Sequence, residues 1–220
     1  TSIKAQITQV SVGSSYSQQA YFSLKDQSVS IVDNDSWDIA FSADGLQDAG
    51  VFVNESAGLG QNALKVYEAN IADWSTPIED LSVYVDSMVL HNPDKNWLDG
   101  AFNSTKDLND AFDYGWGKYN PQSNSVIGNR IYVIEKRDGR YMKFTIESLK
   151  DNTYTFKYAE LDGSNEKNVT VSKADAGEAS LIYYSFDMGV LTNISSEHDL
   201  IFKRYTTPLD AGDGNILEYT

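Results

Sequence analysis

The sequence predicts a mainly β fold built from antiparallel sheets, with one or two short helices. Three observations support this class. Residues 126–160 alternate apolar with polar side chains, residues 36–42 repeat that alternation, and aromatic residues form 12% of a chain that is only 41% hydrophobic. Many aromatic residues beside many polar ones suit half-buried sheets with polar turns, and do not suit a helical bundle.

The clearest strands flank the dipeptide Asp138-Gly139, which favours the type I′ turn of a β-hairpin. Residues 129–136 lead into this turn and residues 140–149 leave it. A third strand, 153–160, continues the alternation of apolar and polar side chains. Together these segments predict an antiparallel meander with one buried face.

Further strands are predicted at residues 21–24, 29–32 and 36–42, where alternating apolar residues follow one another at a period of two. Asp33-Asn34-Asp35 forms the expected turn between the second and third of them, because Asp and Asn side chains bond to nearby backbone. Residues 51–54 predict one more short strand.

The helical content is expected in the middle of the chain. Residues 103–112 predict a short helix, with Asn103 or Ser104 as its N-cap and with Leu108 and Phe112 on one face. Residues 81–90 fit either a strand or a helix, and the pattern does not choose between the two.

An internal repeat is indicated near the C-terminus. Residues 182–186 and 197–202 echo residues 20–24 and 36–41, at a separation of about 160 residues. His198 takes the place of Trp37 in this alignment, which favours a structural role for it.

The repeat divides the chain into three parts. Residues 1–163 are expected to form one β module and residues 164–180 a linker. Residues 181–220 either begin a second module or complete the sheet of the first.

Composition excludes several classes of function. The formal net charge of −15 repels nucleic-acid phosphates and disfavours docking on anionic lipid. The absence of cysteine removes disulfides, thiolate metal sites and cysteine nucleophiles. No apolar run approaches the roughly 18–20 residues of a membrane span, and no signal peptide is visible at Thr1. We expect a secreted or surface-displayed protein.

Nucleophilic catalysis is not expected. The sequence has no Gly-x-Ser-x-Gly motif and only two histidines, His91 and His198, to serve a catalytic triad. Its 32 acidic residues form many neighbouring pairs that are typical of solvated loops. We therefore predict a binding protein with no catalytic residues and no metal site formed by protein ligands alone.

Several of the strand motifs resemble the HmuY family of bacterial haem-scavenging lipoproteins. The motifs that carry the resemblance are, in order, Tyr21-Phe22-Ser23-Leu24, Trp37-Asp38-Ile39-Ala40-Phe41, Arg130-Ile131-Tyr132-Val133-Ile134, Asp138-Gly139-Arg140-Tyr141-Met142-Lys143-Phe144 and Tyr154-Thr155-Phe156-Lys157-Tyr158-Ala159. The match covers about residues 20–160 and is strongest at the two ends of that span.

The resemblance implies a mainly β protein with a lipid anchor on the outer membrane of Bacteroidetes-type bacteria. It further implies capture of haem for a TonB-dependent receptor, with His or Met side chains holding the iron from opposite sides. A haem site also needs an apolar slot for the macrocycle and donors or cations for the propionates.

The resemblance places the iron ligands in two segments. One follows Trp116, and there Tyr119 is the only side chain that can ligate iron. The other segment offers Met88 and His91. His91, Met88 and Tyr119 are therefore the predicted cofactor-binding residues, with haem as the cofactor.

Aromatic residues on predicted loops form the second group of site candidates. Trp97, Trp116 and Tyr114 are predicted to contact a ligand, because aromatic side chains on loops recur in binding surfaces. The alternative for this chain is an accessory subunit without a cofactor, which joins an outer-membrane transport or secretion complex through its aromatic loops and strand edges.

Overall fold

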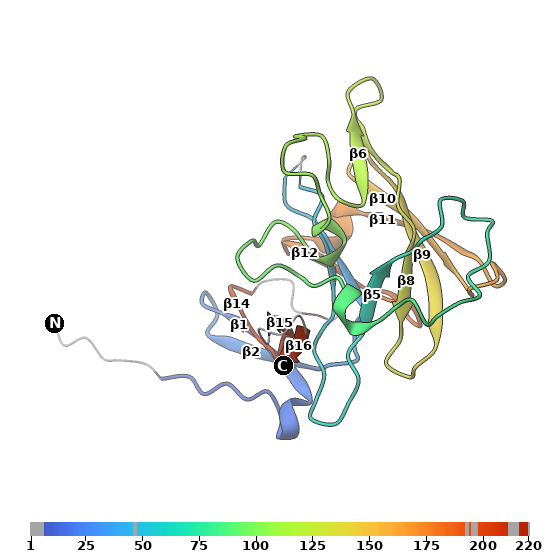
Figure 1. Cartoon of the computed structure of the whole chain (residues 1–220). Coiled ribbons are helices and arrows are strands. Elements are labelled where there is room, and N and C mark those ends of the chain that lie inside the picture. The colour runs from blue at the N-terminus through green and yellow to red at the C-terminus, as the bar shows by residue number, and fades with distance from the viewer. Residues whose placement is uncertain (1–6, 46–47, 192–193, 195–197, 211–215, 220) are drawn as a thin grey trace.

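A computed structural model describes residues 7–45, 48–191, 194, 198–210 and 216–219. Within these residues the chain forms antiparallel strands, and its helical parts are single 3-10 turns, η1 to η4. Figure 1 shows the strands gathered into a larger body at one side and a smaller sheet near the N-terminal segment. The predicted class, mainly β with antiparallel sheets, is confirmed.

The largest sheet has the long strand β9 at its centre. Its strands run in the order β11-β10-β9-β7-β6, and β8 pairs with the first half of β9 and with β5. The bounds are β5 Lys65–Glu68, β6 Gly117–Asn120, β7 Ser125–Gly128, β8 Tyr132–Glu135, β9 Tyr141–Lys150, β10 Thr153–Ala159 and β11 Lys167–Ser172. The predicted meander is confirmed as β8, β9 and β10.

Two smaller sheets and a hairpin contain the remaining strands. One sheet has the order β13-β12-β3-β4 and the other β14-β1-β2, while β15 pairs with β16. Their bounds are β1 Gln18–Ser23, β2 Ser28–Asp33, β3 Ile39–Ser42, β4 Val51–Val53, β12 Leu181–Ser185, β13 Gly189–Leu191, β14 Leu200–Phe202, β15 Thr207–Asp210 and β16 Ile216–Tyr219.

The segments that echo each other in sequence also pair with each other, in a crosswise manner. β12, the counterpart of β1, pairs with β3, whereas β14, the counterpart of β3, pairs with β1. The predicted linker, residues 164–180, contains β11 and the short turn η4 (Lys173–Ala176). The division into modules stays a prediction.

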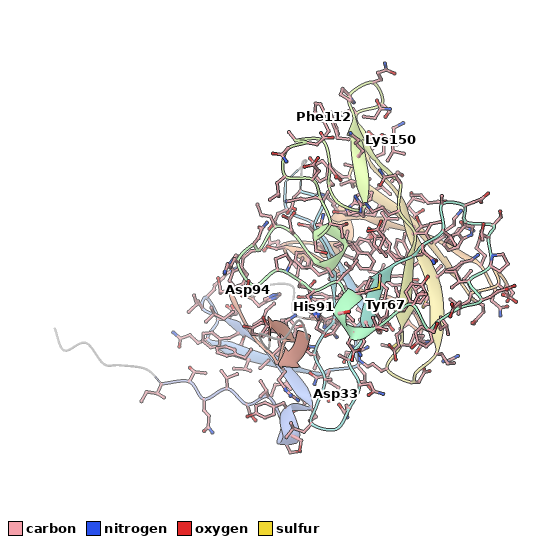
Figure 2. All side chains as sticks on the ribbon, viewed as in Figure 1. Asp33, Tyr67, His91, Asp94, Phe112 and Lys150 are labelled. Atoms are coloured by element: carbon pink, nitrogen blue, oxygen red, sulfur yellow. The ribbon has the colours of Figure 1, made fainter. Side chains whose placement is uncertain are left out.

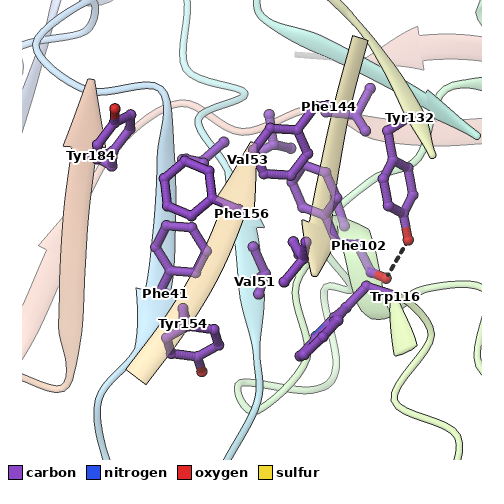
Figure 3. Packing of buried hydrophobic residues seen from close by; sticks show 14 of the residues in the cluster. Phe41, Val51, Val53, Phe102, Trp116, Tyr132, Phe144, Tyr154, Phe156 and Tyr184 are labelled. Atoms are coloured by element: carbon purple, nitrogen blue, oxygen red, sulfur yellow. Dashed lines mark hydrogen bonds between the residues drawn. The ribbon is translucent and has the colours of Figure 1, made fainter. Parts of the chain in front are cut away.

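The main core lies between the largest sheet and the sheet that contains β3. Phe41 of β3 stacks on Phe156 of β10 with ring centroids 5.0 Å apart. Phe102 packs edge-on against Tyr132, 4.8 Å away, and its carbonyl accepts a hydrogen bond from the Tyr132 hydroxyl (Figure 3). The first contact fixes how the two sheets face each other, and the second holds the short turn η3, Ala101–Asn103, against the largest sheet.

Trp116 belongs to this core and not to a ligand-binding surface. Its side chain is fully buried, and its indole N–H donates a hydrogen bond to the Ala49 carbonyl at 2.9 Å. Gly115, with φ of 84°, lies so close to Asn103 that a Cβ there would meet the Asn103 backbone at 2.6 Å. The Gly-Trp pair therefore turns the chain inward, which explains why a predicted loop aromatic is buried.

The turn between β8 and β9 differs in type from the expectation. Gly139 has a φ of 80°, but Asp138 is not among the residues with positive φ. The Gly139 N–H bonds to the Lys136 carbonyl, and the Lys136 N–H bonds to the Arg140 carbonyl. This is a type I turn followed by a left-handed glycine, whereas a type I′ turn needs positive φ at both central residues. The hairpin is confirmed and the predicted turn type is wrong.

The predicted helix over residues 103–112 is also wrong. Only η3, Ala101–Asn103, is helical there, and bends and turns follow it. Asp107, Asp110 and Asp113 each accept the backbone N–H two residues later, from Asn109, Phe112 and Gly115. These Asx turns capture the donors that a helix would have used, so the helix does not extend. Residues 81–90 hold only η2, Asp86–Met88.

Trp74 fixes the long loop after β5 onto the largest sheet. The ammonium groups of Lys143 and Lys157 lie 4.8 and 5.0 Å from the centre of its ring. Its indole N–H donates to Glu166, and the Lys143 ammonium donates to its carbonyl, each at 2.7 Å. Trp74 and its loop cover Lys143, which lies within β9. The Lys143 side chain can therefore be fully buried while its ammonium keeps a hydrogen bond and the contact with the Trp74 ring.

Buried tyrosines predict how stability changes at alkaline pH. Burial raises the pKa of Tyr21 to about 12, and raises the pKa values of Tyr132 and Tyr154 further above the ordinary value near 10. The folded chain holds these hydroxyl protons more tightly than the unfolded chain does. The tyrosines therefore contribute their full stabilisation of the fold below about pH 10, and this contribution is lost as the pH rises through about 12. We expect the urea midpoint of unfolding to fall across this interval.

The same groups can be followed by tyrosinate absorbance in the near ultraviolet. Between the two pH limits the folded chain should ionise fewer tyrosines than the same chain in urea. Simultaneous titration of all 14 tyrosines in the folded chain would contradict this assignment.

Candidate functional site

His91 lies on the loop that follows η2, and a buried carboxylate holds its ring. Its Nδ1 atom is 2.8 Å from Oε1 of Glu55, a residue that is only 4% exposed. A carboxylate bonded to one ring nitrogen orients an imidazole and is the arrangement found behind metal-binding histidines. Among the predicted donors, His91 is therefore the one whose direction is fixed by a charged partner.

Asn92 fixes the backbone beside His91. Its amide nitrogen donates to the Val53 carbonyl at 2.7 Å, and its side-chain oxygen accepts the N–H groups of Val53 and Ala101. Its backbone N–H and its amide both donate to Glu55 as well. The Asn92 side chain thus bonds to the backbone at the end of β4, as the backbone of a neighbouring strand would.

Lys203, in the segment that follows β14, is influenced by Glu55. Burial lowers the pKa of Lys203, and the Glu55 carboxylate opposes that shift. The Lys203 ammonium also lies 5.4 Å from the centre of the Trp37 ring. The neighbouring Ser56 hydroxyl donates to the Arg204 carbonyl, so the residues after β4 contact the segment that follows β14.

Exposed apolar side chains accompany His91 in sequence. Met88 is 49% exposed, and Trp97 is 91% exposed. The other large exposed apolar residues between positions 83 and 98 are Val83, Val85 and Leu98. An exposed Trp and Met on the loop that carries an oriented histidine give this segment the character of a binding surface.

The structure does not bring Tyr119 to His91. Tyr119, on β6, packs against Phe112 with centroids 5.8 Å apart and donates a hydrogen bond to Asn124. Figure 2 shows Phe112 at the upper end of the molecule and His91 near its middle. Tyr114 is half-buried against the main core, and its carbonyl accepts a bond from Asn103. Of the predicted contact aromatics, Trp97 alone is largely exposed.

The positions of the predicted donors indicate how the chain could hold haem. His91, Met88 and the exposed apolar residues of the same loop fit a one-sided contact in which a single imidazole meets the iron. Tyr119 does not fit the opposite side of such a group. The two described cavities are lined by neither His91 nor Met88. Among the described residues no cluster of three or more His, Cys, Asp or Glu could hold a metal ion.

A second polar assembly was not predicted from the sequence. Arg137, in the β8–β9 turn, pairs with Asp38 at 2.9 Å. Its second terminal nitrogen donates to the carbonyls of Asn34, Trp37 and Asn54. The other Asp38 oxygen accepts the Phe186 N–H at 2.8 Å. The partners of Arg137 are about a hundred residues away in the chain, so sequence spacing gave no sign of the pairing.

Asn54 completes this assembly from the end of β4. Its side-chain nitrogen donates to the carbonyls of Asn34 and Trp37, and its oxygen accepts from the amide of Gln19. Burial raises the pKa of Asp38, while the Phe186 N–H and Arg137 act against that rise. The Asp of the Trp37-Asp38 motif is therefore a structural carboxylate, paired and hydrogen-bonded on both oxygens.

The comparison with known families agrees with the motifs. The sequence matches the profile of the HmuY family, described as HmuY protein, over residues 15–162. The chain belongs to the HmuY family. The match includes the early strands, the His91 loop and the meander, so all three predicted haem donors lie within it.

The family indicates the general class of function. HmuY proteins are associated with haem binding and with the cell surface. No curated protein and no solved structure matches this HmuY chain. In the part of the chain that the structure describes, no helix has the length and apolar character needed to cross a bilayer.

The contacts of Glu55 generate a prediction. Glu55→Ala removes the acceptor for His91 and for both N–H groups of Asn92, and should lower the free energy of unfolding by about 2–4 kcal/mol. Glu55→Gln keeps one acceptor oxygen and should cost about half as much. Urea unfolding measures both.

Glu79→Ala is the matched control, because Glu79 is exposed. It should change the free energy of unfolding by less than about 0.5 kcal/mol. An equally small effect of Glu55→Ala would show that the carboxylate does not hold the His91 loop.

Proposed function

We propose that this HmuY-family chain is a surface-displayed, extracytoplasmic binding protein. It captures haem or another planar, hydrophobic nutrient and passes it to an outer-membrane receptor, and it is not an enzyme. The observation that carries the proposal is the oriented His91 on a loop with exposed apolar side chains, within a family associated with haem. Bound haem would supply an iron that takes one imidazole nitrogen.

The residues around His91 suit binding by their own chemistry. Glu55 holds Nδ1, so a ligand would approach the ring through Nε2. Met88 and Trp97 offer polarizable and aromatic surface to a macrocycle. Lys95 is an exposed cation on the same loop and could meet a propionate.

The net charge of the chain should make haem binding depend on the salt concentration. The chain carries a formal charge of −15, and the propionates of haem are anionic. Their mutual repulsion is screened by added ions. Added salt should therefore relieve this long-range repulsion, while it also weakens the single contact between Lys95 and a propionate.

A hemin titration tests the donor assignment. We expect the wild-type chain to shift the Soret band, and His91→Ala to weaken binding at least tenfold, because the imidazole is the proposed iron donor. Met88→Ala should weaken it less, and Tyr119→Phe should leave it unchanged.

His198→Ala is the matched control, since the His198 ring packs edge-on against Tyr21 and lies outside the proposed site. The assignment fails if wild type gives no Soret shift, or if the His91→Ala/Met88→Ala double variant shifts it as wild type does.

A second candidate function has an observation of its own. β14 is the edge strand of its sheet, and its side chains Leu200, Ile201 and Phe202 are 45%, 39% and 41% exposed. An exposed apolar edge strand can accept another strand from a partner chain. This favours the cofactor-free role, an accessory subunit of an outer-membrane transport or secretion complex.

The edge strand can be tested separately from haem. If the chain is such a subunit, Ile201→Lys should release a co-purifying membrane partner, because a charge on the edge blocks strand addition. Leu108→Lys is the control, since Leu108 is 85% exposed and belongs to a turn, outside the strands. Retention of the partner by Ile201→Lys would rule out this interface.

A further inference from the structure

The segments that echo each other in sequence also make the same strand pairs. In that alignment β12 corresponds to β1, and β14 corresponds to β3. Ala20 of β1 lies opposite Phe202 of β14, and their counterparts Ile182 and Phe41 lie opposite each other between β12 and β3. The two strand pairs therefore have the same register.

Asp38 and Asp199 occupy equivalent positions in the repeat and bond in the same way. The N–H of each donates to a carbonyl of the paired strand, β12 or β1, at 2.9 Å in both cases. Each carboxylate accepts a backbone N–H just after that strand, from Phe186 at 2.8 Å and from Leu24 at 2.7 Å. The repeat is thus one of structure as well as of sequence.

Aromatic contacts repeat around a shared centre. Tyr21 of β1 and Tyr183 of β12 meet edge to face, with ring centroids 6.0 Å apart. The Trp37 ring packs edge-on against Tyr183 at 5.0 Å, and the His198 ring packs edge-on against Tyr21 at 4.9 Å. Exchanging the two repeats leaves this set of contacts unchanged. An approximate two-fold axis between the two tyrosines therefore relates the repeats.

The two-fold relation is broken at the outer edge of β14. β3 pairs with β12 on one side and with β4 on the other. Among the strands that the structure describes, β14 pairs with β1 alone. Ile39 and Phe41 of β3 are fully buried, whereas their counterparts Leu200 and Phe202 are 45% and 41% exposed. β14 thus exposes the side chains that β3 buries, beside an edge that no described strand fills.

The pairing of β3 with β4 describes the strand that would fit this edge. β4 runs antiparallel to β3. Its Val51 and Val53 side chains are buried in the main core, and Phe52 packs against the buried cluster that contains Tyr21 and Tyr183. Because successive side chains of a strand point to opposite faces, a strand in the equivalent position on β14 needs consecutive apolar residues to cover both faces.

We propose that the outer edge of β14 is a docking site for an extended, apolar strand of a partner protein. The strand adds antiparallel to β14, in the position that β4 occupies on β3. This inference rests on the second candidate function and specifies which kind of partner segment the edge accepts. In strand addition the backbone hydrogen bonds provide affinity, and the alternate side chains provide selectivity.

Charge and availability favour a foreign strand over a second copy of the chain. Each copy carries a formal charge of −15, so two copies repel each other. The β4 strand of a second copy is already paired with β3 and buried. A partner strand flanked by Lys or Arg residues would instead be attracted by the acidic chain.

A synthetic peptide that copies β4 tests the site in the full chain. Its core is Gly-Val-Phe-Val-Asn, the sequence of residues 50–54, flanked by lysines and labelled with a fluorophore. We expect saturable binding by fluorescence anisotropy and slower hydrogen exchange of the β14 backbone N–H groups by NMR. A peptide with proline in place of the phenylalanine should bind at least about tenfold more weakly, because proline cannot donate to the ladder.

Variants of the chain locate the peptide. Phe202→Asp should weaken peptide binding at least about tenfold, because a charge on an edge strand opposes strand addition. Leu108→Asp is the control, since Leu108 is 85% exposed and belongs to a turn. Hydrogen exchange in the wild-type chain locates the peptide without any substitution, so the site can be judged even if Phe202→Asp does not fold.

Protection at β14 that Phe202→Asp loses and Leu108→Asp keeps supports the site. Absence of binding overturns it, and so does protection confined to β3, which would show the peptide exchanging with β4. A dimer of the peptide-free chain that Phe202→Asp dissociates would also overturn it, because a second copy would then be the occupant.

These results are separable from the proposed functions. Release of a co-purified membrane partner by Ile201→Lys, together with no peptide binding, would keep the accessory role and overturn this inference. Peptide binding at β14 without any co-purifying partner would support the site and contradict the accessory role. Hemin binding at the His91 loop is independent of each result.

Discussion

The buried pairing of Arg137 with Asp38 is the interaction on which the arrangement of the three main sheets depends. Arg137 belongs to the β8–β9 turn of the largest sheet, and Asp38 leads into β3 of the second. The same guanidinium bonds to the Asn34 carbonyl just after β2 of the third sheet. Breaking such a pair leaves an unpaired buried charge, which typically costs about 3–5 kcal/mol. A single side chain therefore holds together elements that have no backbone pairing in common.

The residues at the end of β4 connect the Arg137 assembly to the His91 loop. Asn54 bonds to the carbonyls of Asn34 and Trp37 within the Arg137 assembly, and its neighbour Glu55 bonds to His91. Adjacent residues thus bond to the Arg137 assembly and to the His91 loop. Because successive side chains of extended backbone point to opposite sides, one strand end can hold both clusters.

Local patterns predicted the strands well, and tertiary contacts decided the rest. The meander and the strands around Asp33-Asn34-Asp35 follow from alternation, which is a local signal. The helix over 103–112 failed because aspartates there capture backbone donors two residues on, a competition that helix periodicity does not reveal. Trp116 was placed on a loop surface, but the glycine before it lets the chain turn the ring into the core. For Arg137, the hydrogen-bond partners lie far along the chain, and one sequence gives no means of pairing them.

The two polar clusters beside the end of β4 differ in what they expose. In the Arg137 assembly, the guanidinium, Asp38 and Asn54 bond to one another's backbone or side chains and are buried, whereas the His91 loop carries the exposed side chains Met88 and Trp97. A buried and paired charge holds elements of the fold together, and exposed apolar side chains are free to meet a ligand. Ligand recognition by this HmuY chain is therefore expected at the His91 loop, with the Val53-to-Glu55 strand end as the element that holds that loop in place.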